Sequence, residues 1–81
     1  MRLSYSRHFL EQYAAAPLPV QRAFVKQAAL LLKDLRHPSL RAKKYQAGVD
    51  IWQARVTRSW RFYFSIVGDE YRLHEIVRHP K

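Results

Sequence analysis

The sequence predicts an α+β fold in which two N-terminal helices pack on one face of a mainly antiparallel four-stranded sheet. Apolar residues recur at helical spacing in the first half of the chain and alternate with polar residues in the second half. A short alternating stretch precedes the helices, which gives the order β-α-α-β-β-β. We expect a single domain spanning residues 1–81, because a chain of this length builds one core.

The most informative stretch is residues 51–67, which read IWQARVTRSWRFYFSIV and predict a β-hairpin. A two-residue loop would set charged residues opposite core residues, whereas a three-residue loop over 57–59 pairs apolar with apolar side chains. This loop places Ala54 opposite Phe62 on the core side and Arg55 opposite Arg61 on the other side. Two facing cations repel each other, so we expect an anion to bind on that side of the sheet.

The helices follow from apolar spacing and caps. Residues 2–6 predict the first strand, and Ser6 is expected to cap a short helix over 7–15. Prolines then end this helix, and a second helix is expected from Val20 to about Arg36. Its core stripe is Val20, Phe24, Ala28, Leu31 and Leu35, widened by Leu32.

A row of cations lies on another face of the second helix: Arg22, Lys26, Lys33 and Arg36. We interpret it as a solvated surface, with electrostatic help in reaching RNA or an acidic partner as the alternative. Residues 37–48 (HPSLRAKKYQAG) are interpreted as a basic connector.

The last strand is predicted over residues 70–78, after a two-residue turn at Gly68-Asp69. This turn pairs Tyr63 with His74 and Arg61 with Ile76. Tyr71, Leu73 and Val77 then face the core, and Glu75 is a misfit because it points the same way. The polar face would carry Gln53, Arg55, Arg61, Tyr63, Arg72, His74 and Arg78.

The charge favours a polyanionic partner. The chain has 15 Lys+Arg against 6 Asp+Glu, a formal net charge of +9, which suits nucleic acid first and an acidic protein second. There is no cysteine, so disulfides and thiolate metal sites are excluded. The sequence has neither a signal peptide pattern nor an apolar run that could span a bilayer, so we expect a cytoplasmic protein without membrane contact.

The polar face suits phosphodiester cleavage without a metal. The sequence has no HExxH motif, paired-carboxylate spacing or glycine-rich phosphate loop, so no metal or cofactor is expected. RNA carries its own nucleophile, the 2′-OH, and an enzyme need only orient it, move protons and stabilise phosphate charge. The candidates for binding the scissile phosphate are Arg55, Arg61 and Arg78, and those for proton transfer are His79, His74 and Tyr63. The candidates for further RNA contacts are Arg41, Lys43, Lys44, Gln53, Arg72 and Lys81.

Several segments together resemble the RelE/ParE superfamily of bacterial toxins. They are LP at 18–19, HPSL at 37–40, KKYQAG at 43–48, IWQARV at 51–56, WRFYF at 60–64 and IVRHPK at 76–81. The resemblance covers nearly the whole chain and implies the toxin of a type II toxin–antitoxin system. RelE-like members cut mRNA, commonly in the ribosomal A site, with basic side chains on the open sheet face.

On this similarity Arg55 and Arg61 match the basic positions of the two central strands. Gln53 falls at a position where RelE-like members can carry lysine. Arg78, His79 and Lys81 fall in the region of the family's C-terminal catalytic residues.

The resemblance also implies partners and leaves alternatives open. A toxin requires a neutralising antitoxin, acidic or partly disordered when free, in a hetero-oligomer, and the mRNA target implies the ribosome as well. ParE-like relatives inhibit DNA gyrase without cutting RNA, because fold alone does not settle function. A non-catalytic basic nucleic-acid-binding domain is the third hypothesis.

Overall fold

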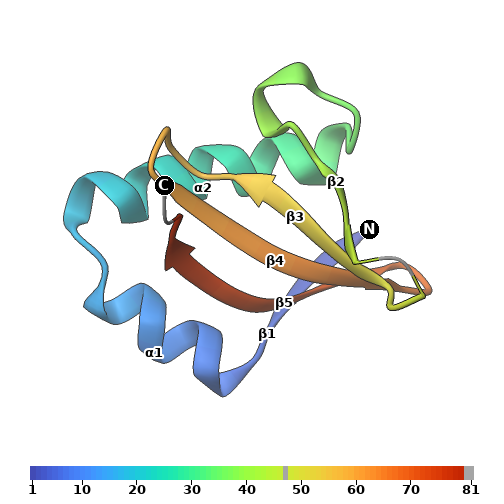
Figure 1. The fold of residues 1–81 in the computed structure, drawn as a ribbon, viewed down its shortest axis with the longest axis horizontal. Helices are drawn as coiled ribbons and strands as arrows, with labels where there is room; N and C mark the ends of the chain where they lie inside the picture. The colour runs from blue at the N-terminus through green and yellow to red at the C-terminus, as the bar shows by residue number, and fades with distance from the viewer. Residues whose placement is uncertain (47, 80–81) are drawn as a thin grey trace.

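The structure is a computed structural model that describes residues 1–46 and 48–79. Within these residues a five-stranded sheet has the order β1-β5-β4-β3-β2, and Figure 1 shows helix α2 behind it. The elements in chain order are β1 (Arg2–Tyr5), α1 (Arg7–Ala15), α2 (Leu18–Lys33), the 3₁₀ helix η1 (Pro38–Leu40), β2 (Lys43–Gln46), β3 (Ile51–Arg55), β4 (Trp60–Val67) and β5 (Glu70–Arg78).

The predicted α+β class is confirmed, but the predicted count of four strands is wrong. Part of the segment interpreted as a connector forms the fifth strand, β2, which pairs antiparallel with β3. This strand was missed because Lys43–Gln46 shows no apolar alternation; it lies at the sheet edge, where lysines are common. The first strand, β1, pairs in parallel with β5 at the opposite edge.

The predicted register of the central hairpin is confirmed. Ala54 pairs with Phe62 and Arg55 with Arg61 across β3 and β4. The three-residue loop is closed by a backbone hydrogen bond of 3.0 Å from Val56 N to Trp60 O. Apolar side chains of both strands therefore lie on the α2 side, and the arginines lie on the open face.

The predicted register of β4 and β5 holds at the turn and is wrong beyond it. Phe64 pairs with Leu73 as predicted, but Tyr63 pairs with Glu75 rather than His74. A β-bulge at His74 supplies the extra residue and inverts the sides of everything after it. Ile76 consequently enters the core opposite Phe62, and the misfit of Glu75 disappears.

The helices cover the side of the sheet opposite the open face. The Ser6 hydroxyl caps α1 by accepting the Phe9 N–H at 2.9 Å, as predicted. Helix α2 ends at Lys33 rather than Arg36, because the Asp34 carboxylate accepts the Arg36 N–H and starts a turn. Leu32 is 42% exposed and does not widen the core stripe. In the described part of the chain, no helix is both long and apolar enough to cross a membrane.

The core lies between these helices and the sheet. Its largest fully buried side chains come from both helical and strand segments: Phe9, Leu31, Leu40, Phe62, Phe64, Leu73 and Ile76. Phe24 of α2 packs edge-on against Phe62 of β4, with ring centroids 5.3 Å apart. The sheet is thereby fixed against α2, and its other face remains open for a site.

Candidate functional site

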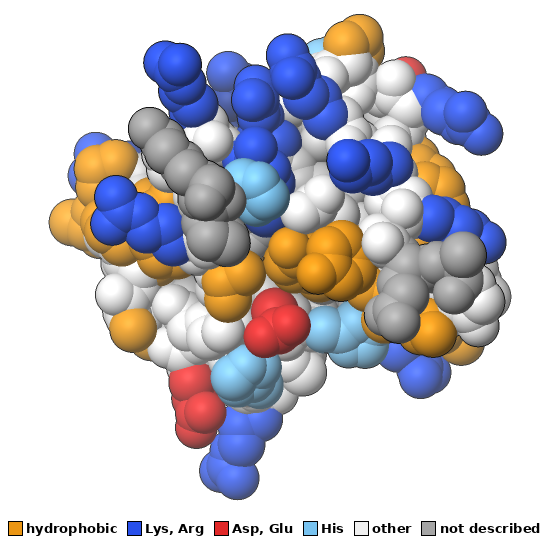
Figure 2. Space-filling model, viewed as in Figure 1, with side chains coloured by type: hydrophobic (Ala, Val, Ile, Leu, Met, Phe, Trp, Pro, Cys, Tyr) orange, Lys and Arg blue, Asp and Glu red, His pale blue; other side chains and the backbone are white. Residues whose placement is uncertain are grey.

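Basic side chains gather on one part of the open sheet face. Figure 2 views this face and shows Lys and Arg side chains crowded over its upper part. The same region contains a hollow of about 230 Å³ above the ends of β2, β3 and β4. Its lining residues are Arg41, Lys43, Gln53, Ala54, Arg55, Arg61 and His79.

The centre of the hollow is the pair Arg55 and Arg61. The two residues are direct partners across β3 and β4, so both side chains project from one point of the open face. The Nε atom of Arg55 is buried and has no hydrogen-bond partner among the described residues. A buried donor without a partner is costly, so this arginine is kept here at the expense of stability.

Arg61 also holds the turn that precedes it. Its Nη1 donates to the carbonyl oxygens of Thr57 at 2.7 Å, Trp60 at 3.0 Å and Arg58 at 3.2 Å. Burial, followed by the like charges of Arg55 and Arg41, lowers the pKa of Arg61. Guanidinium groups stay charged at neutral pH even so, and the other nitrogens of Arg61 can donate to an anion.

Arg41 enters the hollow from outside the hairpin. It follows η1 with a positive φ of 48°, a left-handed conformation that is uncommon for a non-glycine residue but recurs at helix ends, and its N–H donates to Pro38 O at 3.3 Å. The segment before Arg41 is held from α2, where Gln27 is only 5% exposed. Its amide donates to Ser39 O at 3.1 Å and Arg55 O at 2.9 Å, and its oxygen accepts the Ser39 hydroxyl at 3.2 Å.

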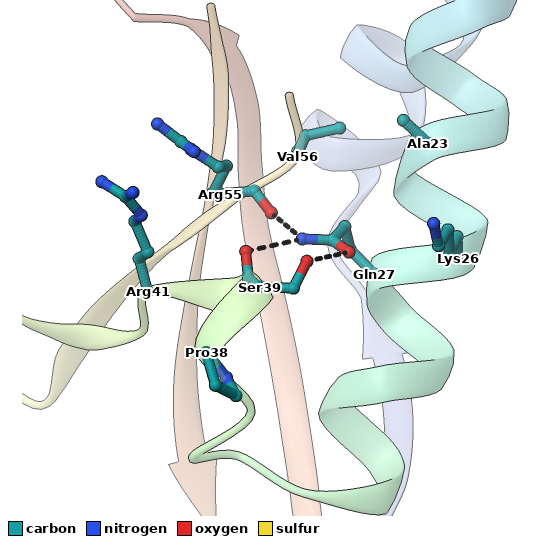
Figure 3. Close-up of a pocket in the computed structure, with 8 residues that line it drawn as sticks. All are labelled: Ala23, Lys26, Gln27, Pro38, Ser39, Arg41, Arg55 and Val56. Atoms are coloured by element: carbon teal, nitrogen blue, oxygen red, sulfur yellow. Dashed lines mark hydrogen bonds between the residues drawn. The ribbon is translucent and has the colours of Figure 1, made fainter. Parts of the chain in front are cut away.

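These contacts of Gln27 tie together two arginine-bearing segments. Figure 3 shows its amide between Ser39 and the backbone of Arg55, while the side chains of Arg41 and Arg55 point away from it. One buried amide therefore fixes the end of β3 and the segment leading to Arg41 relative to each other.

Tyrosines lie beside the hollow. Tyr63 accepts a hydrogen bond of 3.0 Å from Gln53, whose side chain is 8% exposed. Tyr45 of β2 meets Tyr63 edge-on with ring centroids 4.9 Å apart, and Tyr45 is 57% exposed. An exposed aromatic ring next to a cationic hollow can stack on a nucleobase.

The structure brings together six of the predicted site residues: Arg41, Lys43, Gln53, Arg55, Arg61 and His79. Tyr63 adjoins them through Gln53. His79 reaches the hollow because its N–H donates to Ser59 O at 2.6 Å, next to the β3–β4 turn.

Other predicted site residues lie elsewhere. Arg78 pairs with Trp60, which packs against the core, so Arg78 lies on the side of the sheet that faces the helices and not on the open face. The bulge at His74 causes this, because it inverts the end of β5. Lys44 pairs with Trp52 and also lies on that side.

Two more stay on the open face but away from the hollow. Arg72 pairs with the Glu70 carboxylate at 3.1 Å near the β4–β5 turn. His74 Nε2 lies 2.7 Å from Ser65 Oγ. The predicted RNA contact Lys81 lies outside the described residues.

Sequence reasoning missed Tyr45 and Gln27. Tyr45 stands between lysines and glutamine in KKYQ, and this interleaving of basic and aromatic residues was a usable signal for a nucleic-acid contact. Gln27 gives no such signal, since a glutamine in a helix is ordinarily exposed.

The arrangement can bind and polarise a phosphate. Three guanidinium groups converge with a histidine, which is the side chain best suited to proton transfer near neutral pH. Within residues 1–46 and 48–79, no three His, Cys, Asp or Glu side chains cluster closely enough to hold a metal ion.

Comparison with known proteins gives matches in structure alone. No protein-family model matches the chain, and no curated protein matches it in sequence. RelE from the archaeal RelE–RelB complex of Pyrococcus horikoshii OT3 superposes with a TM-score of 0.81 at 13% identity, covering 99% of this chain and 96% of that one. YafQ from E. coli BL21(DE3) gives 0.79 at 16% identity over 94% and 90%.

The YoeB/ParE toxin from Agrobacterium tumefaciens also gives a TM-score of 0.79, at 13% identity over 99% of this chain and 100% of that one. The chain therefore has the fold of RelE, YafQ and YoeB/ParE toxins, which confirms the fold expected from the resemblance to the RelE/ParE superfamily.

Proposed function

We propose that this chain is the toxin of a toxin–antitoxin pair and that it cleaves mRNA on the ribosome without a metal. The observation that carries the proposal is the hollow in which Arg41, Arg55, Arg61 and His79 converge. The facing guanidinium groups of Arg55 and Arg61 support an anionic ligand there. The likeness in fold to the RelE and YafQ toxins supports the reaction class.

The reaction needs only groups that the hollow supplies. The 2′-oxygen attacks the phosphorus and loses its proton, while the bond from phosphorus to the 5′-oxygen breaks and that oxygen gains a proton. The products are a 2′,3′-cyclic phosphate and a 5′-hydroxyl. Arg55 and Arg61 stabilise the charge that develops on the phosphate, a contribution of about 3 kcal/mol per lost donor. His79 serves in proton transfer, and Tyr45 with Tyr63 supports a base beside the scissile bond.

The antitoxin is the second part of the proposal. A net charge of +9 favours an acidic partner, and the RelE of P. horikoshii was solved in a complex with RelB. Co-expression of the protein encoded beside this chain should restore growth that the chain alone arrests. Continued arrest with both proteins present at equal levels would speak against that partner.

Arg55→Ala is the variant that tests the nuclease. Arg61→Ala would also disturb the turn, whereas the Arg55 side chain donates no hydrogen bond to the described residues whose loss would unfold the protein. Wild type, Arg55→Ala and the exposed control Arg58→Ala are induced in a bacterial host, and primer extension follows a reporter mRNA. We expect growth arrest and new 5′ ends with wild type and Arg58→Ala, and neither with Arg55→Ala.

The other outcomes separate the alternatives. Arrest with intact mRNA and altered DNA supercoiling would point to a ParE-like gyrase inhibitor. Absence of arrest from well-folded wild type, together with salt-sensitive RNA binding, would leave a non-catalytic nucleic-acid-binding domain. Purified protein with and without ribosomes then tests the ribosome dependence.

A further inference from the structure

A second groove adjoins the hollow on the side toward α2. It has a volume of about 450 Å³ and lies between α2, η1 and the end of β3. Two of its residues, Arg41 and Arg55, also line the hollow, so the two spaces are neighbours with these arginines between them. The groove is lined by Ala23, Lys26, Gln27, Pro38, Ser39, Arg41, Arg55 and Val56.

The lining combines cations with apolar surface. Lys26 lies on the α2 side, across Gln27 and Ser39 from the two arginines (Figure 3). None of the described lining residues is acidic. Ala23, Pro38 and Val56 provide apolar walls. Cations with apolar surface suit a nucleotide, which has an anionic phosphate and a base with two flat faces that lack polar groups.

The polar groups of Gln27 at the floor of the groove already make hydrogen bonds within the protein. Both amide hydrogens of Gln27 are donated to backbone carbonyls, and its oxygen accepts the Ser39 hydroxyl. A ligand in the groove therefore gains little from the floor and depends on the cations at its rim. Lys26 is the rim residue that belongs to the groove and not to the hollow.

We propose that this groove holds a nucleotide flanking the scissile phosphate, with its own phosphate bound between Lys26 and the shared arginines. The inference rests on the proposed function, because it treats the hollow as the scissile subsite. RNA that leaves the hollow past Arg41 and Arg55 enters the groove directly. The row of cations on α2 then has one member, Lys26, that contacts substrate, while Lys33 lies outside the groove.

The test measures binding of RNA that cannot be cleaved. Oligoribonucleotides with 2′-O-methyl groups lack the nucleophile, and their length sets the number of phosphates. Wild type is compared with Lys26→Ala, with Lys26→Arg, and with Lys33→Ala as a control that removes the same charge from the same helix. All substituted side chains are exposed, so the fold is retained.

We expect a dinucleotide with one phosphate to bind wild type and Lys26→Ala equally. For longer probes, Lys26→Ala should lower the slope of log affinity against log salt by about 0.7, the value for one single-strand phosphate contact. This slope corresponds to about fivefold weaker binding at about 0.1 M salt, relative to 1 M. Lys26→Arg should retain wild-type affinity, and Lys33→Ala should match wild type.

Three results would overturn the inference. Lys26→Ala and Lys33→Ala could behave alike at every length, or Lys26→Ala could weaken the dinucleotide as much as the longer probes. An oligoglutamate of equal charge could also bind as tightly as RNA and with the same dependence on Lys26, which would assign the groove to an acidic peptide.

Cleavage of unmodified RNA, measured with ribosomes, separates this inference from the proposed function. Length-dependent binding through Lys26 without any cleavage would support a nucleotide-binding groove at Lys26 and refute the nuclease. Cleavage by wild type, together with RNA binding that does not depend on Lys26, would support the nuclease and refute the groove as a nucleotide-binding site.

Discussion

Arg55 and Arg61 stand directly opposite each other across β3 and β4, on the face of the sheet that the helices leave open. Like charges in this position destabilise a sheet, by roughly 0.2–1 kcal/mol per pair. The sheet nevertheless keeps both, and it also buries the Arg55 Nε without a partner. An anion bound between the two guanidinium groups would offset their repulsion. The protein therefore gives up some stability to keep a binding site for an anion.

Arg55→Ala should therefore separate stability from activity. Removing one of two facing cations is expected to raise the free energy of unfolding by roughly 0.2–1 kcal/mol. The same change should lower mRNA cleavage by about 10²–10³-fold, because a donor to the phosphate is lost. Urea denaturation and primer extension measure the two effects, with Arg58→Ala as the control. A variant that loses stability together with activity would contradict this account.

Arg61→Ala should behave differently although it removes the same charge. Its Nη1 donates to three carbonyl oxygens in and beside the β3–β4 turn. We expect a net loss of about 1–2 kcal/mol in the free energy of unfolding, because these bonds exceed the relief of repulsion. Equal stability of Arg55→Ala and Arg61→Ala in urea would show that the turn does not depend on this guanidinium.

The sequence predicts the central part of this site because strands have a fixed period. Alternation alone places Arg55 opposite Arg61 once the loop length is chosen, and the structure has this pairing. The same logic misplaces Arg78, because one inserted residue at His74 reverses all later side chains. No local pattern marks that bulge.

Residues that reach the site from outside the hairpin are predicted less well. Lys43 and Arg41 were expected to contact RNA from their charge alone, and the edge strand that positions Lys43 was missed. The role of Gln27 depends on contacts 12 and 28 residues away along the chain. Such contacts exist only in the folded protein, so periodicity and propensity cannot reveal them.

Gln27→Ala should damage both the fold and the site. Two backbone carbonyls, of Ser39 and Arg55, would lose their donor in a partly buried place, at a cost of about 2–4 kcal/mol in the free energy of unfolding. The segment that leads to Arg41 should also lose its connection to the end of β3, which weakens RNA binding.

Gln21→Ala provides the matched control for the effect of Gln27→Ala. Its amide also donates to two carbonyls, of Tyr13 and Ala16, but these join α1 to α2 away from the hollow. At a temperature where both variants are folded, only Gln27→Ala should bind uncleavable RNA more weakly. Equal loss of binding in the two variants would mean that Gln27 acts through general stability.

The two histidines of the β5 region give the sharpest test of proton transfer. His79 lines the hollow with the arginines, whereas His74 lies in the bulge with its Nε2 2.7 Å from Ser65 Oγ. His79→Ala should lower the cleavage rate by about 10²–10⁴-fold, the usual contribution of a positioned acid or base. The pH–rate profile should lose one limb as well, because the side chain that transfers the proton is removed. His74→Ala should leave both rate and profile close to wild type and can lose some stability through Ser65. The converse pattern, with activity lost in His74→Ala and kept in His79→Ala, would move the reacting phosphate away from the arginine hollow and toward the β4–β5 end of the sheet.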